Sequence, residues 1–396
     1  FSNPVLEIEN DFITLNLEES NSYLYEDGKP ELPGYTETFY YPFGTKITKI
    51  TCTLSDFKEI KLDKILKPTD KPRTSQMLTN ELQDEEPIDY GNEPYPIECY
   101  SYNLGCGRTE NGLSVIVNIQ VYPIKFFPEE NMIKWANNAN IIVEYEPPDE
   151  PIIFDDEYKF VIIAPTEYGD ELAPLISHKI GRGISTIFVS LSDIYSGVYF
   201  PDEGRDDQEM KKYFIKDAIE NWGTSYVLLV GGSEKCPVRF SNVYLSGNDD
   251  EYTFISDLYY ADIYNETGAF CDWDSNQNDV FGEFNWGPEH NFDEVDLYPD
   301  VFLGRLACTS GNQVTTCVNK IKKYENEAAY SQEWFKNYVG IAGDNNVEET
   351  SDTPEGEYCV EKAIDIMDDF NPDLIFDTNG KLGSWSPPYG TGHITN

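Results

Sequence analysis

Short strands dominate the pattern of the first 145 residues. Runs of alternating apolar and polar residues, or of β-branched residues, are separated by clusters of Pro, Gly and Asn, a pattern typical of β-strands joined by turns. Because such strands bury one face against a second sheet, we predict an all-β sandwich over residues 1–150. The clearest predicted strands cover residues 37–41, 46–54, 114–121 and 140–145.

After residue 156 the pattern changes. Short apolar runs are now separated by segments in which the apolar residues recur with a period of about 3.6 instead of two. Strands and amphipathic helices then alternate, which predicts a mainly parallel sheet with helices on both faces over residues 157–330. A long polar and aromatic insertion at 248–296 interrupts this order. The strands predicted in this part cover residues 160–164, 184–191, 226–230 and 301–306.

The same pattern begins again near residue 331. Residues 338–342 and 374–376 are predicted strands with a helical face between them, so we interpret 331–396 as the incomplete start of a second α/β subdomain. The boundary after the sandwich is placed at residues 146–156, which carry three prolines and five acids. The predicted fold class is therefore multidomain: an N-terminal all-β sandwich, an α/β three-layer sheet domain and an unfinished second subdomain.

Length and charge narrow the classes of function. A chain of 396 residues exceeds the roughly 250–300 residues that one hydrophobic core serves. Its 72 acidic and 28 basic residues give a formal net charge of −44, which repels phosphate backbones and excludes nucleic acid as the expected partner. No apolar run approaches the ~20 residues of a spanning helix, so no transmembrane segment is predicted.

Cysteine and histidine residues supply few candidates for catalysis. Eight cysteines without a C-x-x-C pair favour a secreted or cell-surface protein with a few disulfides, and buried free thiols are the alternative. Cys308 ends a predicted strand, where nucleophiles of open α/β sheets often lie, but a buried or disulfide-bonded thiol is the preferred interpretation. His178 and His290 are interpreted as structural or surface residues. The sequence lacks the signatures of phosphate loops, dinucleotide-binding turns, zincins and hydrolase elbows.

One acidic segment, residues 272–283, has the composition of a calcium loop. Oxygen-bearing side chains stand at its first, third and fifth positions and a Glu at its twelfth, which suits the oxygen ligands of Ca²⁺. Gln277 replaces the usual Gly and Asp279 the usual apolar residue, so a solvated acidic loop is the alternative. The predicted calcium ligands are Asp272, Asp274, Asn276, Asn278 and Glu283, with Asp257 or Asp262 as additional candidates.

Several segments, in order along nearly the whole chain, carry a resemblance to a known family. The most specific is Tyr-Pro-Asp-Val-Phe-Leu-Gly-Arg-Leu at 298–306, which leads into residues 320–325. The other segments are residues 28–33, 117–123, 141–146, 158–165, 172–175, 226–232 and 256–260. Together they resemble the gingipain family of cysteine peptidases, which combine a β-sandwich propeptide with a caspase-like catalytic domain of two α/β subdomains.

The resemblance implies a secreted cysteine endopeptidase that cleaves protein or peptide substrates and binds its own N-terminal propeptide. In that family a His assists a Cys thiolate, and both stand at strand ends of the second subdomain. Here His393 follows residues 384–390, which are predicted as coil, and Cys308 does not match the family's nucleophile. We therefore assign no catalytic residue, expect the dyad beyond Asn396, and predict that this chain alone is inactive.

A protein of another class is the alternative. The same scaffold would suit a non-catalytic, calcium-dependent surface or adhesion protein, because a fold does not determine function. In the reading frame after Asn396, a His-Gly strand end and then a Cys strand end would favour the peptidase. A stop codon or repeat modules would favour the adhesion protein.

Overall fold

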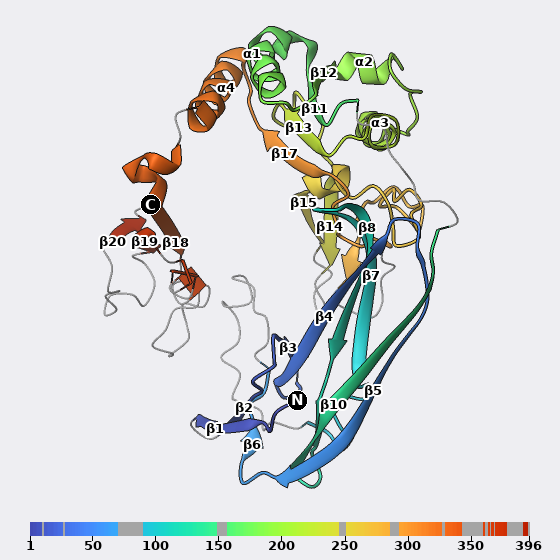
Figure 1. Cartoon of the computed structure of the whole chain (residues 1–396), viewed down its shortest axis with the longest axis vertical. Helices are drawn as coiled ribbons and strands as arrows, with labels where there is room; N and C mark the ends of the chain where they lie inside the picture. Colours follow the sequence, from blue (N-terminus) through green and yellow to red (C-terminus); the bar gives the residue numbers. More distant parts are fainter. Residues whose placement is uncertain are drawn as a thin grey trace. The chain divides into compact units, whose positions relative to one another are not determined.

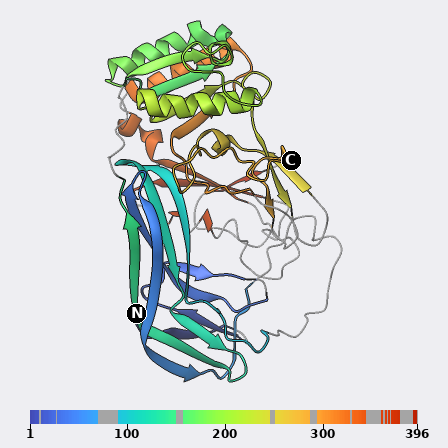
Figure 2. The same cartoon turned by 90° about the vertical axis from the view of Figure 1, so that its right-hand side faces the viewer.

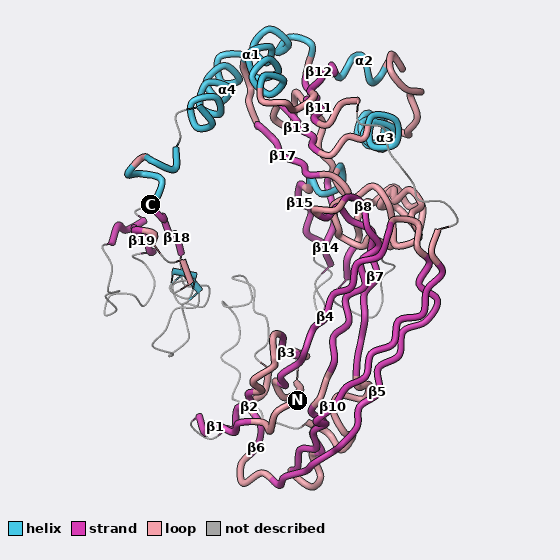
Figure 3. Tube along the Cα trace, viewed as in Figure 1, coloured by secondary structure: helices cyan, strands magenta, loops and turns pink. Residues whose placement is uncertain are grey.

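The structure is a computed structural model of the chain. Figures 1 and 3 show its strands and helices. It forms two compact units, of which the first comprises Phe1–Tyr25, Pro30–Lys67 and Gly91–Lys322, and the second includes Lys323–Asn396. The structure describes residues 1–9, 12–26, 28–69, 90–148, 157–244, 251–285, 293–326, 329–342, 359–360, 363–364, 366–367, 369–377 and 391–394.

Residues 1–146, here named the β-rich segment, are built from strands, and no helix occurs among the residues described there. Their sheets have the strand orders β3-β4-β8-β7, β5-β10-β9 and β1-β2-β6. In Figure 2 the long blue and teal strands lie side by side. The strands are β1 (Val5–Glu9), β2 (Phe12–Asn16), β3 (Ser22–Leu24), β4 (Leu32–Pro42), β5 (Lys46–Lys61), β6 (Ile65–Leu66), β7 (Tyr100–Thr109), β8 (Gly112–Val121), β9 (Ile124–Phe127) and β10 (Met132–Glu146).

An apolar core joins two of these sheets. Val117, Ile119 and Val121 alternate along β8 and are fully buried, as the period of two predicts for a strand with one covered face. They pack with Ile50 and Cys52 of β5, which belongs to the other sheet. The four clearest strands predicted from the sequence all lie within strands of the structure.

Residues 157–322, here named the α/β segment, contain a parallel sheet of strand order β12-β11-β13-β17 with helices on both faces. Val161 and Ile163 of β11 pack against α3, whereas Ile162 and Ala164 pack against α1 and α4. The predicted mixed α/β architecture is confirmed. The elements are β11 (Phe160–Ala164), η2 (Thr166–Tyr168), α1 (Gly169–Gly181), β12 (Thr186–Ser190), α2 (Leu191–Tyr195), α3 (Asp207–Trp222), β13 (Tyr226–Val230), β17 (Phe302–Leu306) and α4 (Gly311–Asn326).

Local signals in the sequence set the ends of α3. The Asp206 carboxylate accepts a hydrogen bond from the backbone N of Glu209 at 2.8 Å, which caps the first turn. Gly223 ends the helix with a φ of 68°, a left-handed conformation that Gly adopts without a steric penalty. Between these ends, Phe214, Ala218 and Trp222 are buried on the face that was predicted to be apolar.

The insertion between β13 and β17 forms a small sheet of order β15-β14-β16 beside short helical turns. Its elements are β14 (Phe240–Tyr244), β15 (Glu251–Ile255), η3 (Asp257–Tyr260) and β16 (Phe284–Asn285). The second unit contains a parallel sheet of order β18-β19-β20. Its elements are η4 (Ala329–Ser331), η5 (Glu333–Lys336), β18 (Asn337–Ala342), β19 (Asn371–Asp377) and β20 (Thr391–Ile394).

Most of the predicted linker, from residue 149 to residue 156, lies outside the described residues, as does His290. The linker falls between β10 and β11, where the strand pattern gives way to alternating strands and helices. Among the described residues, no helix combines the length and the apolar composition needed to cross a membrane.

Candidate functional site

The acidic loop, residues 272–283, folds around its own polar side chains. The buried Asp274 carboxylate accepts a hydrogen bond from the backbone N of Asn278 at 2.8 Å. The side-chain amides of Asn276 and Asn278 donate to Oε2 of Glu283 at 2.8 and 2.6 Å. Asp272 accepts from the backbone N of Asp274 at 3.1 Å. The five predicted ligands therefore lie together, but both amides direct their NH₂ groups toward Glu283.

A guanidinium offsets part of the negative charge of this loop. Arg205, just before α3, lies 2.5 Å from Oδ2 of Asp274 and 3.5 Å from carboxylate oxygens of Asp272 and Asp279. It also pairs with Glu209 at 3.0 Å, and the hydrogen bonds to Glu209 and Asp274 raise the pKa of the guanidinium. Acidic side chains crowded into one loop repel one another unless a positive charge lies among them. The structure supplies Arg205, which sequence reasoning missed because 69 positions separate it from Asp274.

The additional calcium candidates have other partners. Asp257 forms a bidentate ion pair with Arg305, with N–O distances of 2.5 and 2.7 Å. Asp262 accepts a hydrogen bond from Nε1 of Trp273 at 3.1 Å. Within the part of the chain that the structure describes, no group of three or more His, Cys, Asp or Glu side chains is arranged to hold a metal ion. The positive charge that the structure places against the buried Asp274 carboxylate is the guanidinium of Arg205.

The second unit corrects the interpretation of His393. Residues 384–390, which were predicted as coil, lie outside the described residues, but Thr391–Ile394 directly after them form strand β20 and not a continuation of that coil. β20 pairs in parallel with β19, with Phe376 opposite His393. Gly-rich flanks obscured this strand in the sequence, since its formation depends on hydrogen bonds to a neighbouring strand rather than on an apolar period. His393 therefore stands near the carboxyl end of a parallel strand, the edge at which open α/β sheets place their sites.

All eight cysteines are free thiols in the structure. Burial raises the pKa of Cys52 and of Cys308 to about 11, and the pKa of Cys271 to about 12. A thiol with such a pKa is protonated at neutral pH, and the thiolate is the nucleophilic form. Cys308, which follows β17, is thus a buried thiol, as the preferred interpretation expected.

The β-rich segment binds the α/β segment through Arg108 of β7. Its Nε donates to the main-chain oxygen of Asp300 at 2.8 Å. The two remaining guanidinium nitrogens donate to Oγ of Ser225 at 3.1 Å and to the main-chain oxygen of Thr224 at 3.2 Å. Burial lowers the pKa of this guanidinium, and the Asp300 carboxylate opposes that shift. One side chain thereby joins strand β7 to two separate loops of the α/β segment.

Two glycines of β7 allow close approach beside Arg108. A Cβ atom on Gly105 would lie 2.2 Å from the ring of Tyr298, and one on Gly107 would lie 3.0 Å from Cβ of Tyr298. The backbone N of Cys106, between them, donates to Asp296 at 2.8 Å. The missing side chains therefore let Tyr298 and Asp296 contact the backbone of β7 directly.

Buried ionisable groups surround this contact. Burial raises the pKa of Asp262 to about 6, of Asp296 to about 7 and of Asp300 to about 8. The nearby Lys212 of α3 is fully buried, and burial lowers its pKa to about 8. Its Nζ lies 4.3 Å from the centroid of the Tyr259 ring. The contact between the two segments thus includes buried aspartates whose charged forms are disfavoured by burial.

A family model and several solved structures are similar to parts of this chain. The family model for peptidase family C25 matches residues 154–390. A structure of gingipain K from Porphyromonas gingivalis, concerned with zymogenic latency, is similar at 18% identity over 36% of this chain and 81% of the other, with a TM-score of 0.26. The complex of the pro- and mature domains of RgpB from the same organism is similar at 20% identity over 58% of this chain, with a TM-score of 0.34.

The Arg-specific cysteine proteinase gingipain R is similar at 18% identity over 61% of this chain, with a TM-score of 0.34. The chain spans about half the length of these last two structures, 49% and 51% respectively. No curated protein matches the chain. Because the family model covers well over half of the 396 residues, the gingipain resemblance is confirmed, and the chain belongs to peptidase family C25.

Proposed function

We propose that this chain is part of a secreted cysteine endopeptidase in which the N-terminal residues act as an inhibitory propeptide. The family match over residues 154–390 carries this proposal. A Cys thiolate would attack the scissile carbonyl, a His would transfer its proton to the leaving amine, and backbone amides would hold the oxyanion. The substrates are proteins or peptides.

His393 is our candidate for the base. Its support is the position of β20 as the third parallel strand of the second unit, with His393 next to the last residue of that strand. We assign the nucleophile to none of the eight cysteines. The pKa of Cys52, Cys271 and Cys308 is raised well above neutrality, which makes their thiols poor nucleophiles. That the Cys of the dyad follows Asn396 stays a prediction.

The β-rich segment is our candidate for the propeptide. Support comes from the hydrogen bonds of Arg108 and of the Cys106 backbone to the α/β segment, which hold one end of β7 against it. Cleavage within residues 146–156, which are acidic and rich in Pro, would leave the β-rich segment bound only through such contacts. Release of the β-rich segment after cleavage would then depend on the strength of these contacts.

Calcium binding by the acidic loop also stays a proposal. Asp272, Asp274 and Glu283 supply carboxylate oxygens of the kind that Ca²⁺ prefers. A bound ion would compete with Arg205 for the Asp274 carboxylate, which makes the effect of calcium depend on that arginine.

The experiment that tests the peptidase function uses the chain extended along its reading frame beyond Asn396. Proteolytic removal of the β-rich segment should start hydrolysis of peptide substrates. The variant His393→Ala should lose that activity by several orders of magnitude, because the thiolate loses its base. The matched variant His178→Ala, which changes a histidine of α1, should remain active. A stop codon directly after Asn396, or full activity of His393→Ala, would refute the assignment.

A further inference from the structure

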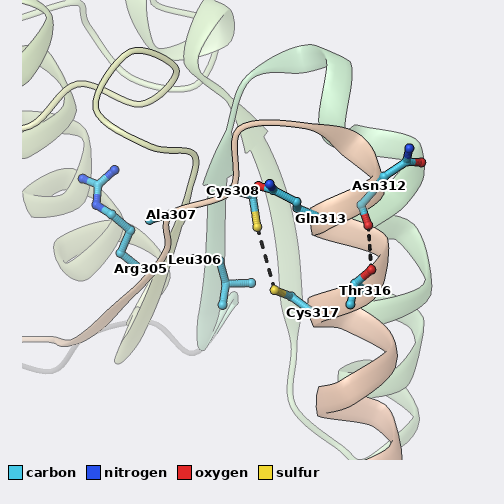
Figure 4. A pocket seen from close by; sticks show the side chains of 8 residues that line it. All are labelled: Arg305, Leu306, Ala307, Cys308, Asn312, Gln313, Thr316 and Cys317. Atoms are coloured by element: carbon cyan, nitrogen blue, oxygen red, sulfur yellow. Dashed lines mark hydrogen bonds between the residues drawn. The ribbon is translucent and has the colours of Figure 1, made fainter. Parts of the chain in front are cut away.

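Two thiols face each other at the carboxyl end of β17. Cys308 follows that strand by two residues, and Cys317 lies in the second turn of α4. Their Sγ atoms are 3.9 Å apart, with the Cys308 thiol donating toward Cys317. In Figure 4 the two side chains point toward one another from the strand end and from the helix. A disulfide needs an S–S distance of about 2.05 Å, so the two sulfurs must approach by about 1.9 Å for a bond to form.

The backbone around the pair is held in place. The backbone N of Gly232, after β13, donates to the main-chain oxygen of Cys308 at 3.0 Å. Oε1 of Gln313, in the first turn of α4, accepts from the backbone N of Thr309 at 2.8 Å. The strand end and the start of the helix are therefore fixed relative to each other, which keeps the two sulfurs close.

A cavity gives small molecules access to these sulfurs. It has a volume of about 460 Å³, and both Cys308 and Cys317 line it together with Arg305 and Asn312. Cys308 is buried, at 4% exposure, whereas Cys317 is only partly buried. Cys317 is therefore the more accessible of the two residues to a reagent that enters the cavity.

We propose that Cys308 and Cys317 form a redox-active pair, which a low-molecular-weight disulfide converts into an intramolecular disulfide that ties α4 to the end of β17. This modification is independent of the proposed peptidase chemistry. It concerns the first unit alone, because all the residues involved precede Lys323.

The reaction proceeds by two thiol–disulfide exchanges. The Cys317 thiol loses its proton, and its thiolate attacks one sulfur of the small disulfide. An S–S bond to Cys317 forms, the original S–S bond breaks, and one thiolate leaves and takes up a proton. The Cys308 thiolate then attacks the Cys317 sulfur and displaces the second small thiol. Two protein thiols are oxidised and one small disulfide is reduced to two thiols.

The surroundings of Cys308 make the second exchange the slow one. Burial raises the pKa of the Cys308 thiol well above neutrality, so few molecules carry the thiolate at neutral pH. The rate of ring closure should therefore rise with pH up to about 11. Once formed, the bond closes a short loop between the strand and α4, and it should raise the midpoint of thermal unfolding of the first unit.

Trypsin makes the pair convenient to measure. Cleavage after Arg305 and Lys320 leaves both cysteines on one peptide, residues 306–320, which contains no other cysteine. We would incubate the purified chain with oxidised glutathione, quench it with acid, alkylate it with iodoacetamide in urea, and digest it without reductant. The expected peptide carries no alkyl group and is two hydrogens lighter than the reduced peptide. Prior treatment with a reductant should restore two alkylated cysteines.

Single variants separate the two steps. Cys308→Ser should stop the reaction at a stable mixed disulfide between Cys317 and glutathione. Cys317→Ser should leave Cys308 reduced. The exposed Cys359 provides the matched control, since Cys359→Ser should still form the intramolecular bond. The proposal is overturned if peptide 306–320 of the unchanged chain keeps two alkylated cysteines after Cys359 has reacted. The proposal is also overturned if Cys317 of the unchanged chain forms a mixed disulfide with glutathione that is never converted into the Cys308–Cys317 disulfide.

Discussion

Arg108 and Asp300 lie 192 positions apart in the sequence, and Nε of Arg108 donates a hydrogen bond to the main-chain oxygen of Asp300 at 2.8 Å. This bond joins the β-rich segment to the α/β segment within one compact unit. The guanidinium also reaches Thr224 and Ser225, so a single side chain satisfies acceptors on two loops. The β-rich segment, which we propose to be a propeptide, is held here by a few directional hydrogen bonds, and each of them can be removed by mutation.

The first prediction concerns Arg108 itself. Arg108→Ala leaves the main-chain oxygens of Asp300 and Thr224 without this donor, and we expect the free energy of unfolding to fall by about 1–3 kcal/mol. Urea unfolding measures the loss, and limited proteolysis should release the β-rich segment sooner. Lys49→Ala is the control, because Lys49 forms only an exposed ion pair with Glu144. Equal effects of the two substitutions would contradict the role of Arg108.

The second prediction uses the close approach of Tyr298 to β7. In Gly105→Ala the new methyl group would lie 2.2 Å from the Tyr298 ring, so the ring or the strand must move. We expect a cost of about 1–3 kcal/mol in the free energy of unfolding, as for other overpacked contacts. Gly304→Ala in β17 is the control, since a methyl group there meets no atom within 4 Å. A Gly105→Ala chain as stable as the unchanged chain would show that the contact accommodates the added methyl group.

The third prediction concerns pH. The raised pKa values of Asp262, Asp296 and Asp300, about 6, 7 and 8, mean that the folded chain binds protons more tightly than the unfolded chain. Unfolded Asp titrates near ~3.9, so this stabilisation is complete below that pH and is lost as the pH rises through about 6 to about 8. We therefore expect the thermal midpoint to fall from about pH 4 to about pH 8, because the folded chain binds more protons than the unfolded chain throughout that range.

Asp296→Asn tests the origin of that loss. The amide oxygen still accepts from the backbone N of Cys106, whereas the bond from the backbone N of Tyr298 is lost and the side chain no longer ionises. The fall in the thermal midpoint should become shallower up to about pH 7. Asp63→Asn removes a carboxylate from an exposed position and should leave the slope unchanged. An unchanged slope in Asp296→Asn would place the pH dependence elsewhere.

The fourth prediction concerns the acidic loop. Calcium at a hundredfold excess over Kd should stabilise the chain by about 2.7 kcal/mol relative to chelator. Arg205→Ala should lower the thermal midpoint in chelator, because Asp274 then stays buried without its cation. The same variant should gain more from calcium than the unchanged chain does. No calcium effect in either chain, with no bound metal, would leave Arg205 as the cation of the loop and reject the calcium site.

The fifth prediction is that the 396-residue chain by itself hydrolyses no peptide. A thiol needs a base and a prepared oxyanion site, and losing one member of such a set removes several orders of magnitude of rate. The assay combines the chain with calcium, a reductant and peptides that vary before the scissile bond. Turnover that disappears in Cys308→Ala or His393→Ala would mean that the dyad lies within these residues.

The sequence by itself determined the elements whose pattern is local. Alternating residues of β8, the apolar run of β11 and the buried face of α3 are read from neighbours along the chain, because burial of one face imposes a period of two or about 3.6. Segments spread along the chain also carried the family resemblance. The strand that contains His393 was not predicted from the sequence, because the formation of a short Gly-containing strand depends on hydrogen bonds to its partner β19.

Only the tertiary structure decided which distant groups meet. Arg205 reaches Asp274, Arg108 reaches the loop at Asp300, and Cys308 faces Cys317 across a turn. Periodicity reports which face of an element is buried, but it carries no information about the element packed against that face. The partner of a charge or a thiol follows from the path of the whole chain, and so do the pKa values that burial shifts.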